Sequence, residues 1–158
     1  MMKTEIIIVL DRSGSMESVA SDTVGGLNAF IEKQKQLPGE ATFTLLQFDT
    51  IFDYVRTAVP LRDVAPITRD EFHPRGATAL HDAICIGIDD AGKRLAAMPE
   101  HERPQGVVFA ILTDGLENAS SKFTKDQVRE KIEHQTKNYN WQFLYLGANQ
   151  DAILTGES

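Results

Sequence analysis

The sequence predicts an α/β fold with a doubly wound, mostly parallel sheet, one antiparallel edge strand and helices on both faces. Three observations lead to this prediction. Two near-continuous apolar segments, 5–10 and 106–115, are typical of central parallel strands, which are buried on both faces. Segments with helical spacing lie between the strand segments. Two strand segments, 41–49 and 51–61, follow each other almost at once, so we expect them to pair as an antiparallel hairpin.

The first part of the chain predicts one central strand, one helix and the strand pair. Residues 5–10, EIIIVL, form the strand. The next segment is helical by its spacing and ends at a Pro-Gly pair, which stops a helix. Its periodic apolar residues are Val24, Leu27, Phe30 and Ile31. Residues 41–49 are rich in β-branched and aromatic side chains, as strands are, and the turn to 51–61 is expected near 49–50.

The middle of the chain combines a long loop with a strongly amphipathic helix. Residues 62–78 contain two prolines, mixed charge and no sustained period, so we expect a loop that is long enough to have a function. Residues 79–98 carry apolar side chains at i, i+4, i+8, i+11 and i+15, which predicts a helix with one buried face. These side chains belong to Leu80, Ile84, Ile88, Ala91 and Leu95.

The last part predicts a strand, a helix and a further strand. The apolar segment 106–115 ends in an aspartate. Residues 124–140 are expected to form a helix with a Thr or Ser cap, and 141–149 a strand. Residues 150–158 are expected to begin a last helix. No internal repeat or linker interrupts this order, so residues 1–158 are interpreted as one domain.

Composition narrows the class of protein. The chain has 158 residues, 42% of them hydrophobic, and a formal net charge of −7, which argues against binding to a nucleic-acid backbone. Its one cysteine, Cys85, excludes an internal disulfide and fits a reducing compartment. The N-terminal apolar run of five residues is too short for a signal peptide or a membrane span, so we expect a cytoplasmic protein without membrane contact.

Polar clusters follow the predicted strands and the long loop. The first is VLDRSGSM, the second ILTDGLEN, and the third is PRGATALHD at the end of the loop. Ligands of open α/β sheets bind beyond the carboxyl ends of the strands, so we expect the three clusters to meet there. They would bring together Asp11, Ser13, Ser15, Thr78 and Asp114.

This set of side chains offers only oxygen atoms, namely three hydroxyls and two carboxylates. Such sites suit Mg²⁺, Mn²⁺ or Ca²⁺ rather than zinc or copper. Alternation along the turn lets Ser13 and Ser15 point at one cation while Asp11 braces them. If neutral hydroxyls dominate the site, the cation keeps much of its charge and attracts an anionic group from outside. We therefore expect the cation to bridge to an Asp or Glu of a protein partner.

These residues resemble the metal-ion-dependent adhesion site (MIDAS) of von Willebrand factor A (vWA) domains, which have a Rossmann-like fold. That site has the pattern Asp-x-Ser-x-Ser, then Thr, then Asp. DRSGS supplies Asp11, Ser13 and Ser15; GAT supplies Thr78; TDG supplies Asp114. The segments LDRSGSM and LTDGLEN are similar to the corresponding segments of bacterial and phage vWA proteins. The resemblance covers nearly the whole chain and its element order.

The resemblance implies a role for each residue. Ser13 and Ser15 would bind the metal directly, and Asp11 would act through water and orient the serines. Thr78 and Asp114 would bind directly or through water. A water or a partner carboxylate would take the sixth position. Family members mostly bind proteins, so the resemblance implies a metal-dependent adhesion or adaptor domain and not an enzyme.

The chain departs from the family at its C-terminus. Family domains continue past the FLYLGAN strand with a helix, a strand and a final helix, whereas this sequence ends at Ser158. We therefore expect the last family elements to be absent or truncated, and the family's affinity switch is not carried over. A missing layer leaves an apolar edge that another molecule could cover, so a homo-oligomer is a further expectation.

Alternatives remain at this stage. The serine turn alone could be an ordinary helix cap. A magnesium-dependent phosphohydrolase is the second functional hypothesis, although Ser13 stands where a haloacid-dehalogenase phosphatase needs its second acid, and neither a nucleophile elbow nor a P-loop occurs. The third is an assembly subunit with a purely structural metal. Asp82 could support the site, cap the helix or face solvent. Arginines 62, 69 and 75 of the long loop could help to hold an acidic partner.

Overall fold

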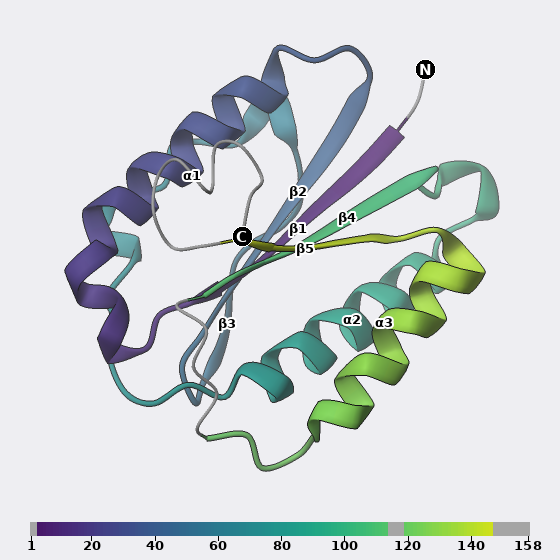
Figure 1. Cartoon of the computed structure of the whole chain (residues 1–158). Coiled ribbons are helices and arrows are strands. Elements are labelled where there is room, and N and C mark those ends of the chain that lie inside the picture. Colours follow the sequence, from purple (N-terminus) through teal and green to yellow (C-terminus); the bar gives the residue numbers. More distant parts are fainter. Residues whose placement is uncertain (1–2, 114–118, 147–158) are drawn as a thin grey trace.

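The computed structural model describes residues 3–113 and 119–146, and within these ranges five strands form one sheet in the order β3-β2-β1-β4-β5. The strands are β1 (Lys3–Asp11), β2 (Glu40–Phe48), β3 (Phe52–Pro60), β4 (Gly106–Leu112) and β5 (Gln142–Leu146). β1 pairs in parallel with β2 and β4, and β4 pairs in parallel with β5. β3 is the antiparallel edge strand, paired with β2. The predicted mixed sheet and its hairpin are therefore confirmed (Figure 1).

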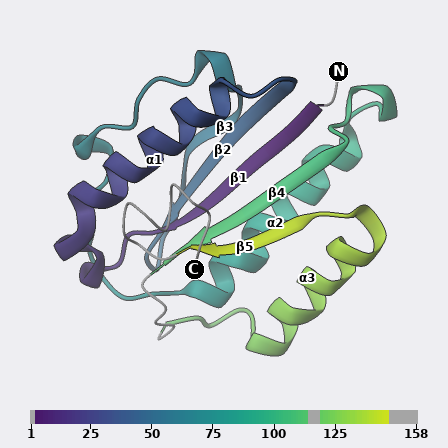
Figure 2. The same cartoon turned by 45° about the horizontal axis from the view of Figure 1, so that its top comes forward.

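Helices cover both faces of this sheet. The three α-helices of the described residues are α1 (Ala20–Lys35), α2 (Leu80–Ala97) and α3 (Lys125–Tyr139). α1 lies on one face, and α2 and α3 lie side by side on the other, as the turned view makes clear (Figure 2). The doubly wound arrangement expected from the sequence is thus observed. Within the same described ranges, four short 3₁₀ turns lie between these elements, at Gly14–Val19, Leu61–Asp63, Arg69–Glu71 and Glu100–Glu102.

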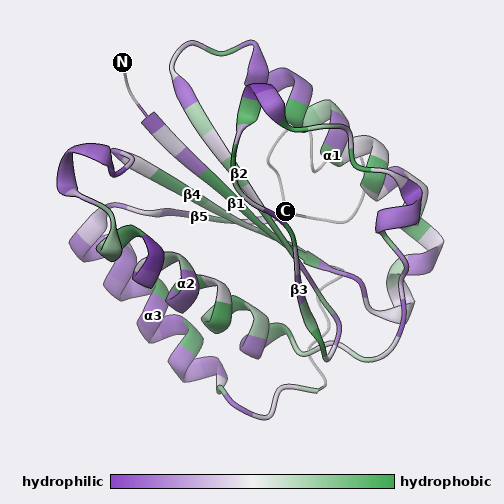
Figure 3. Cartoon of the chain, turned by 180° about the vertical axis from the view of Figure 1, so that it is seen from behind, coloured by the Kyte–Doolittle hydropathy of each residue, from purple (hydrophilic) through white to green (hydrophobic). Residues whose placement is uncertain are grey.

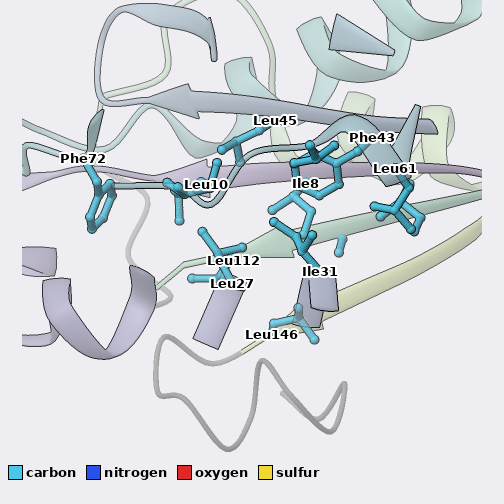
Figure 4. Close-up of a cluster of buried hydrophobic side chains, with 14 of the residues drawn as sticks. Ile8, Leu10, Leu27, Ile31, Phe43, Leu45, Leu61, Phe72, Leu112 and Leu146 are labelled. Atoms are coloured by element: carbon cyan, nitrogen blue, oxygen red, sulfur yellow. The ribbon is translucent and has the colours of Figure 1, made fainter. Parts of the chain in front are cut away.

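Alternate side chains of β1 belong to the two cores. Ile6, Ile8 and Leu10 pack on the α1 side, whereas Ile7 and Val9 pack on the α2 side. Figure 4 shows the α1-side core, in which side chains from α1, from the sheet and from the long loop meet. Its labelled members are Ile8, Leu10, Leu27, Ile31, Phe43, Leu45, Leu61, Phe72, Leu112 and Leu146. Because β1 is buried on both faces, its uninterrupted apolar run is explained.

The two cores also account for the helical periodicity. Four of the five periodic side chains of α2 are buried and the fifth, Leu95, is partly buried. In Figure 3, α3 is mostly hydrophilic, whereas α2 mixes hydrophilic and hydrophobic residues. Cys85 is buried within the α2-side core, where burial raises the pKa of its thiol to about 11. Trp141, just before β5, stacks on Phe109 with their ring centroids 6.3 Å apart.

The long loop contains no helix or strand beyond its short turns, as predicted, but it is tied to the core. Val64, Ile67 and Phe72 are each at most 2% exposed. Asn28 of α1 holds the loop as well, because its side chain accepts from the Ile67 N–H and donates to the Ile67 carbonyl. Because of these contacts, the end of the loop lies at the carboxyl edge of the sheet.

The chain reverses its direction across the sheet between β1 and β4. From β1 it proceeds through α1 to β2 and β3 on one side, and then returns through α2 to β4 on the other. Such a reversal leaves a crevice at the carboxyl ends of the two strands, where open α/β sheets bind ligands. The described residues contain no helix that is long and apolar enough to cross a membrane.

Candidate metal centre

The serine turn follows β1 at this reversal point. Asp11 is the last residue of β1 and is fully buried, Ser13 is 2% exposed, and Ser15 is exposed. The backbone leaves the sheet here because the N–H of Met16 donates to the carbonyl of Ser13 at 2.9 Å, which starts the 3₁₀ turn. The turn therefore presents its hydroxyls at the carboxyl edge of the sheet.

Asp11 braces this turn from behind. Its Oδ1 accepts a hydrogen bond from the Ser13 N–H at 2.7 Å, and its Oδ2 accepts one from the Thr113 hydroxyl at 2.9 Å. Both carboxylate oxygens are thus bound to protein groups. Such an aspartate can orient the serines and accept from a metal-bound water, the indirect role that the family resemblance implies.

The two serine hydroxyls converge. Ser13 Oγ and Ser15 Oγ lie 3.2 Å apart, and either can donate to the other. Adjacent oxygens around an octahedral Mg²⁺ are about 3.0 Å apart, given Mg–O distances near 2.1 Å. The observed separation therefore fits two neighbouring ligands of one small divalent cation.

The loop that carries Thr78 lies directly against the serine turn. The N–H of Arg75 donates to the carbonyl of Arg12 at 2.7 Å, and the N–H of Gly14 donates to the carbonyl of Gly76 at 3.0 Å. Gly76 has a φ of +70°, a conformation that favours glycine. Thr78 itself is 1% exposed. Ser13, which stands between Arg12 and Gly14, is therefore close in space to Gly76, which is 63 residues away in the sequence.

Two further backbone hydrogen bonds fix Thr78 from its other sides. The N–H of Ala79 donates to the carbonyl of Asp49, and the N–H of Ala119 donates to the carbonyl of Thr78, each at 3.0 Å. The loop that carries Thr78 is therefore held by the residue that follows β2 and by the segment that follows β4. Four of the predicted positions, Asp11, Ser13, Ser15 and Thr78, accordingly belong to one edge of the sheet.

Asp49 is a residue of this region that the sequence analysis did not assign to the site. Its carboxylate is 3% exposed and accepts from the Ile51 N–H at 2.6 Å and from Arg75 Nε at 2.9 Å. Arg12 Nε lies 3.6 Å from the same oxygen. Burial by itself would raise the pKa of Asp49, but the Ile51 N–H and the two arginines outweigh it and lower that pKa. The available signal was its position at the end of an apolar strand, the same signal that identified Asp11.

Asp82 joins α2 to the segment that follows β4. It is 3% exposed, and its carboxylate accepts from the backbone N–H groups of Ser121, Lys122 and Phe123 at 2.8–3.0 Å. The side chain of Ser120 accepts from the Asp82 N–H in return. Of the three roles considered for Asp82, solvent exposure is wrong, because this carboxylate is a buried anchor of the neighbouring loop.

The fifth predicted ligand, Asp114, lies outside the described residues, as does 150–158. Within the described ranges, no group of three or more His, Cys, Asp and Glu side chains is arranged to hold a metal ion. The expected site differs from such a group, because three of its five predicted ligands are hydroxyls. Its described donor atoms, the converging serine hydroxyls and the braced Asp11 carboxylate, fit a hard divalent cation.

Comparison with known proteins supports the fold. No protein-family model matches the chain, and no curated protein matches it in sequence. Among solved structures, proximal thread matrix protein 1 from the mussel byssus is similar over 92% of this chain, with a TM-score of 0.63 and 17% identity. A second crystal form of that protein gives a TM-score of 0.60 at 14% identity and the same coverage.

Manganese-loaded TRAP protein from Plasmodium vivax is also similar, over 94% of this chain, with a TM-score of 0.59 and 15% identity. Both neighbours contain vWA domains, so the chain has the fold that the sequence resemblance implies. The chain spans 36–38% of the mussel protein and 58% of the TRAP structure.

Proposed function

We propose that this chain is a divalent-metal-dependent protein-binding domain. Asp11, Ser13, Ser15, Thr78 and Asp114 hold the cation, with Mg²⁺ as the first candidate and Mn²⁺ or Ca²⁺ as the others. The cation supplies an open coordination position for an Asp or Glu carboxylate of a protein partner. The chain's own residues orient the hydroxyls and keep the site at the edge of the sheet.

One observation carries this proposal, namely the convergence of the Ser13 and Ser15 hydroxyls in front of a buried, fully engaged Asp11. Hydroxyl ligands are neutral, and both oxygens of Asp11 already accept hydrogen bonds from the Ser13 N–H and the Thr113 hydroxyl. A cation bound there keeps most of its charge, which favours an anionic ligand from outside. A carboxylate of another protein meets that need.

The solved neighbours support the proposal by analogy. The TRAP structure is manganese-loaded, which shows that a protein of this fold binds a divalent cation. The mussel protein is a thread matrix protein of the byssus. We accordingly favour a binding domain over a metal-dependent phosphohydrolase.

Metal-linked stability tests the site. Mg²⁺ at 100 times its Kd should stabilise the wild-type protein by about 2.7 kcal/mol, because it binds only the folded chain. For a chain of this size that corresponds to a rise in Tm of about 5–11 °C. Ser13→Ala and Asp114→Ala should each lose most of this shift. Ser21→Ala, an exposed serine of α1, is the matched control and should keep it.

A second measurement tests the partner chemistry. A peptide with a single Glu should bind in Mg²⁺ and lose binding in EDTA, as followed by fluorescence anisotropy. Equal metal shifts in Ser13→Ala, Asp114→Ala and wild type would contradict the proposed site. Turnover of phosphoesters that depends on the same residues would instead favour the hydrolase hypothesis.

A further inference from the structure

A pair of arginines flanks the serine turn and shares one carboxylate. Arg75 Nε lies 2.9 Å and Arg12 Nε 3.6 Å from the same oxygen, Oδ2 of Asp49. Arg12 also approaches Asp53 at 3.7 Å, but the Asp53 side chain is 61% exposed, so that contact contributes little. Two guanidinium groups therefore face a single buried carboxylate. Both arginines lie beside the serine turn, in a chain whose net charge is −7.

The guanidinium of Arg12 is only weakly bound by these carboxylates. Its side chain is 10% exposed, and its Nε is buried without a hydrogen-bond partner among the described residues. Its two ion pairs, at 3.6 and 3.7 Å, are too long for hydrogen bonds. Burying a guanidinium is unfavourable unless anionic groups compensate it. Part of the missing compensation can come from a ligand that approaches from outside.

Arg75 is the group that such a ligand would meet. Its side chain is 59% exposed, yet it is held at two points, since its N–H donates to Arg12 and its Nε to Asp49. Among the described residues, neither terminal nitrogen of Arg75 has a hydrogen bond. An arginine whose Nε is fixed presents those two nitrogens in a defined direction. Little side-chain entropy is then lost when they bind a carboxylate.

The other arginines of the long loop do not have this arrangement. Arg69 donates to the Phe72 carbonyl and pairs with Glu17 at 2.9 Å. Arg62 lines a groove with Lys3 and Pro38, near the opposite end of the strands. Arg75, by contrast, immediately precedes Gly76, whose carbonyl binds the serine turn.

We propose that the partner segment carries two acidic side chains, one for the cation and a second for the terminal nitrogens of Arg75. This inference rests on the proposed function and specifies the partner. Arg75 is a specificity-determining residue that pairs with the second carboxylate through charge-assisted hydrogen bonds. Arg12 shares the Asp49 carboxylate with Arg75 and also approaches Asp53, so its charge adds only weakly to the attraction.

Short synthetic peptides on a neutral Ala/Ser scaffold test this proposal. One peptide carries a single Glu, and four others carry a second Glu one to four residues further on. In a matched set, Gln replaces the second Glu. At the best spacing, the wild-type protein in Mg²⁺ should bind the Glu/Glu peptide about two- to fivefold more tightly than its Glu/Gln counterpart, as expected for a partly exposed charge pair. Fluorescence anisotropy at fixed ionic strength gives the ratio.

Variants of Arg75 test whether this residue causes the preference for the Glu/Glu peptide. Arg75→Gln removes the paired donors and should abolish the preference, so that the Glu/Glu and Glu/Gln peptides bind alike; the Mg²⁺-induced shift in Tm of the same variant shows whether its metal site is intact. Arg75→Lys keeps the charge without the paired donors and should retain only part of the preference. Arg62→Gln is the control and should behave as wild type. Urea unfolding of each variant shows whether it is folded.

The outcomes separate the two proposals. If single-Glu peptides bind in a metal-dependent way but Arg75→Gln and Arg75→Lys keep the full preference for two acids, the role of Arg75 is wrong and the metal site stands. If the wild type shows no preference at any spacing, the two-acid partner is likewise wrong. If no acidic peptide binds in Mg²⁺, the proposed function fails and this inference fails with it.

Discussion

Asp49 shows how one residue can fix two loops of the sheet edge. Its carboxylate holds Arg75, and its carbonyl accepts from Ala79, so both ends of the segment that carries Thr78 depend on it. Because burial is outweighed by the Ile51 N–H and by the two arginines, the pKa of Asp49 is below its usual value of 3.8. The folded state therefore binds a proton at Asp49 less readily than the unfolded state does.

This lowered pKa predicts a contribution to acid stability. The stabilisation is fully present above the unfolded pKa, near 3.8, and is lost as the pH falls through the lower pKa of the folded state. The Asn variant of Asp49 (Asp49→Asn) should have a lower free energy of unfolding at pH 7 than the wild type. Between about pH 4 and pH 2, its free energy of unfolding should fall less steeply than that of the wild type. Urea midpoints over that range provide the measurement. Glu130→Gln, an exposed residue of α3, is the control and should keep the wild-type slope; equal slopes in all three proteins would contradict the prediction.

Individual site residues differed in how well the sequence revealed them. Asp11, Ser13 and Ser15 follow an apolar run directly, so local sequence was sufficient to single them out. Asp49 also follows a strand, but one that contains two threonines and a glutamine, and its place at the hairpin turn explained it without a further role. The partners of Asp82 lie about 40 residues away, and no local pattern indicates such a contact.

At the level of elements, α2 owes its close approach to the sheet to Gly87. A Cβ at this position would lie 3.1 Å from Phe109 Cζ and 3.4 Å from Val9 Cγ2, and both of these neighbours are fully buried. The same helix contains Gly92, where a Cβ would meet no atom within 4 Å. A substitution at Gly87 therefore tests core packing and helix propensity together, whereas one at Gly92 tests helix propensity alone.

Alanine substitutions should have opposite effects at these two positions. Gly92→Ala should stabilise the protein by about 0.5–1 kcal/mol, because alanine is the better helix former. Gly87→Ala gains the same propensity but forces Phe109 or the helix to shift, so it should destabilise the protein by about 1–3 kcal/mol. Chemical denaturation of both variants measures the difference. Stabilisation by Gly87→Ala would show that the α2-side core has room that the structure does not show.

The helices and strands themselves were largely predictable, because their periodicities are set by burial on one face or two. The details of β3 were not. Its pairing with β2 shifts register between Phe43 and Leu46, and Ala58 has a φ of +48° with its N–H bound to the Thr44 hydroxyl. Such irregularities depend on cross-strand hydrogen bonds between particular side chains, which alternation along one strand cannot indicate.

Across the whole molecule, a buried ion pair links the central strand to α2. Glu5 of β1 is 2% exposed, and its two oxygens accept from Arg94 of α2 at 2.6 and 2.8 Å. Hydrogen bonding to Glu5, although opposed by burial, raises the pKa of Arg94. With Asp82 near its first turn and Arg94 near its last, α2 is fastened at both ends.

Removing one partner of this pair should affect global stability. Arg94→Met leaves Glu5 buried and unpaired, so we expect a loss of about 3–5 kcal/mol in the free energy of unfolding. The double variant Glu5→Leu with Arg94→Met should recover most of it. Arg129→Met breaks an exposed pair with Asp126 and should lose less than about 1 kcal/mol. Equal losses from Arg94→Met and Arg129→Met would contradict the prediction.

The strand order has a consequence for how the chain matures. β1 is synthesised before the other four described strands but lies in the middle of the sheet, and its second neighbour, β4, begins at residue 106. A nascent chain therefore carries a β1 edge with open hydrogen-bonding groups until β4 emerges from the ribosome, which exposes it to aggregation or to chaperones. The Thr113 hydroxyl that braces Asp11, 102 residues away, arrives at the same moment. The serine turn thus reaches its final form only after residue 113 has been synthesised, and a shorter nascent chain would lack the Thr113 contact to Asp11.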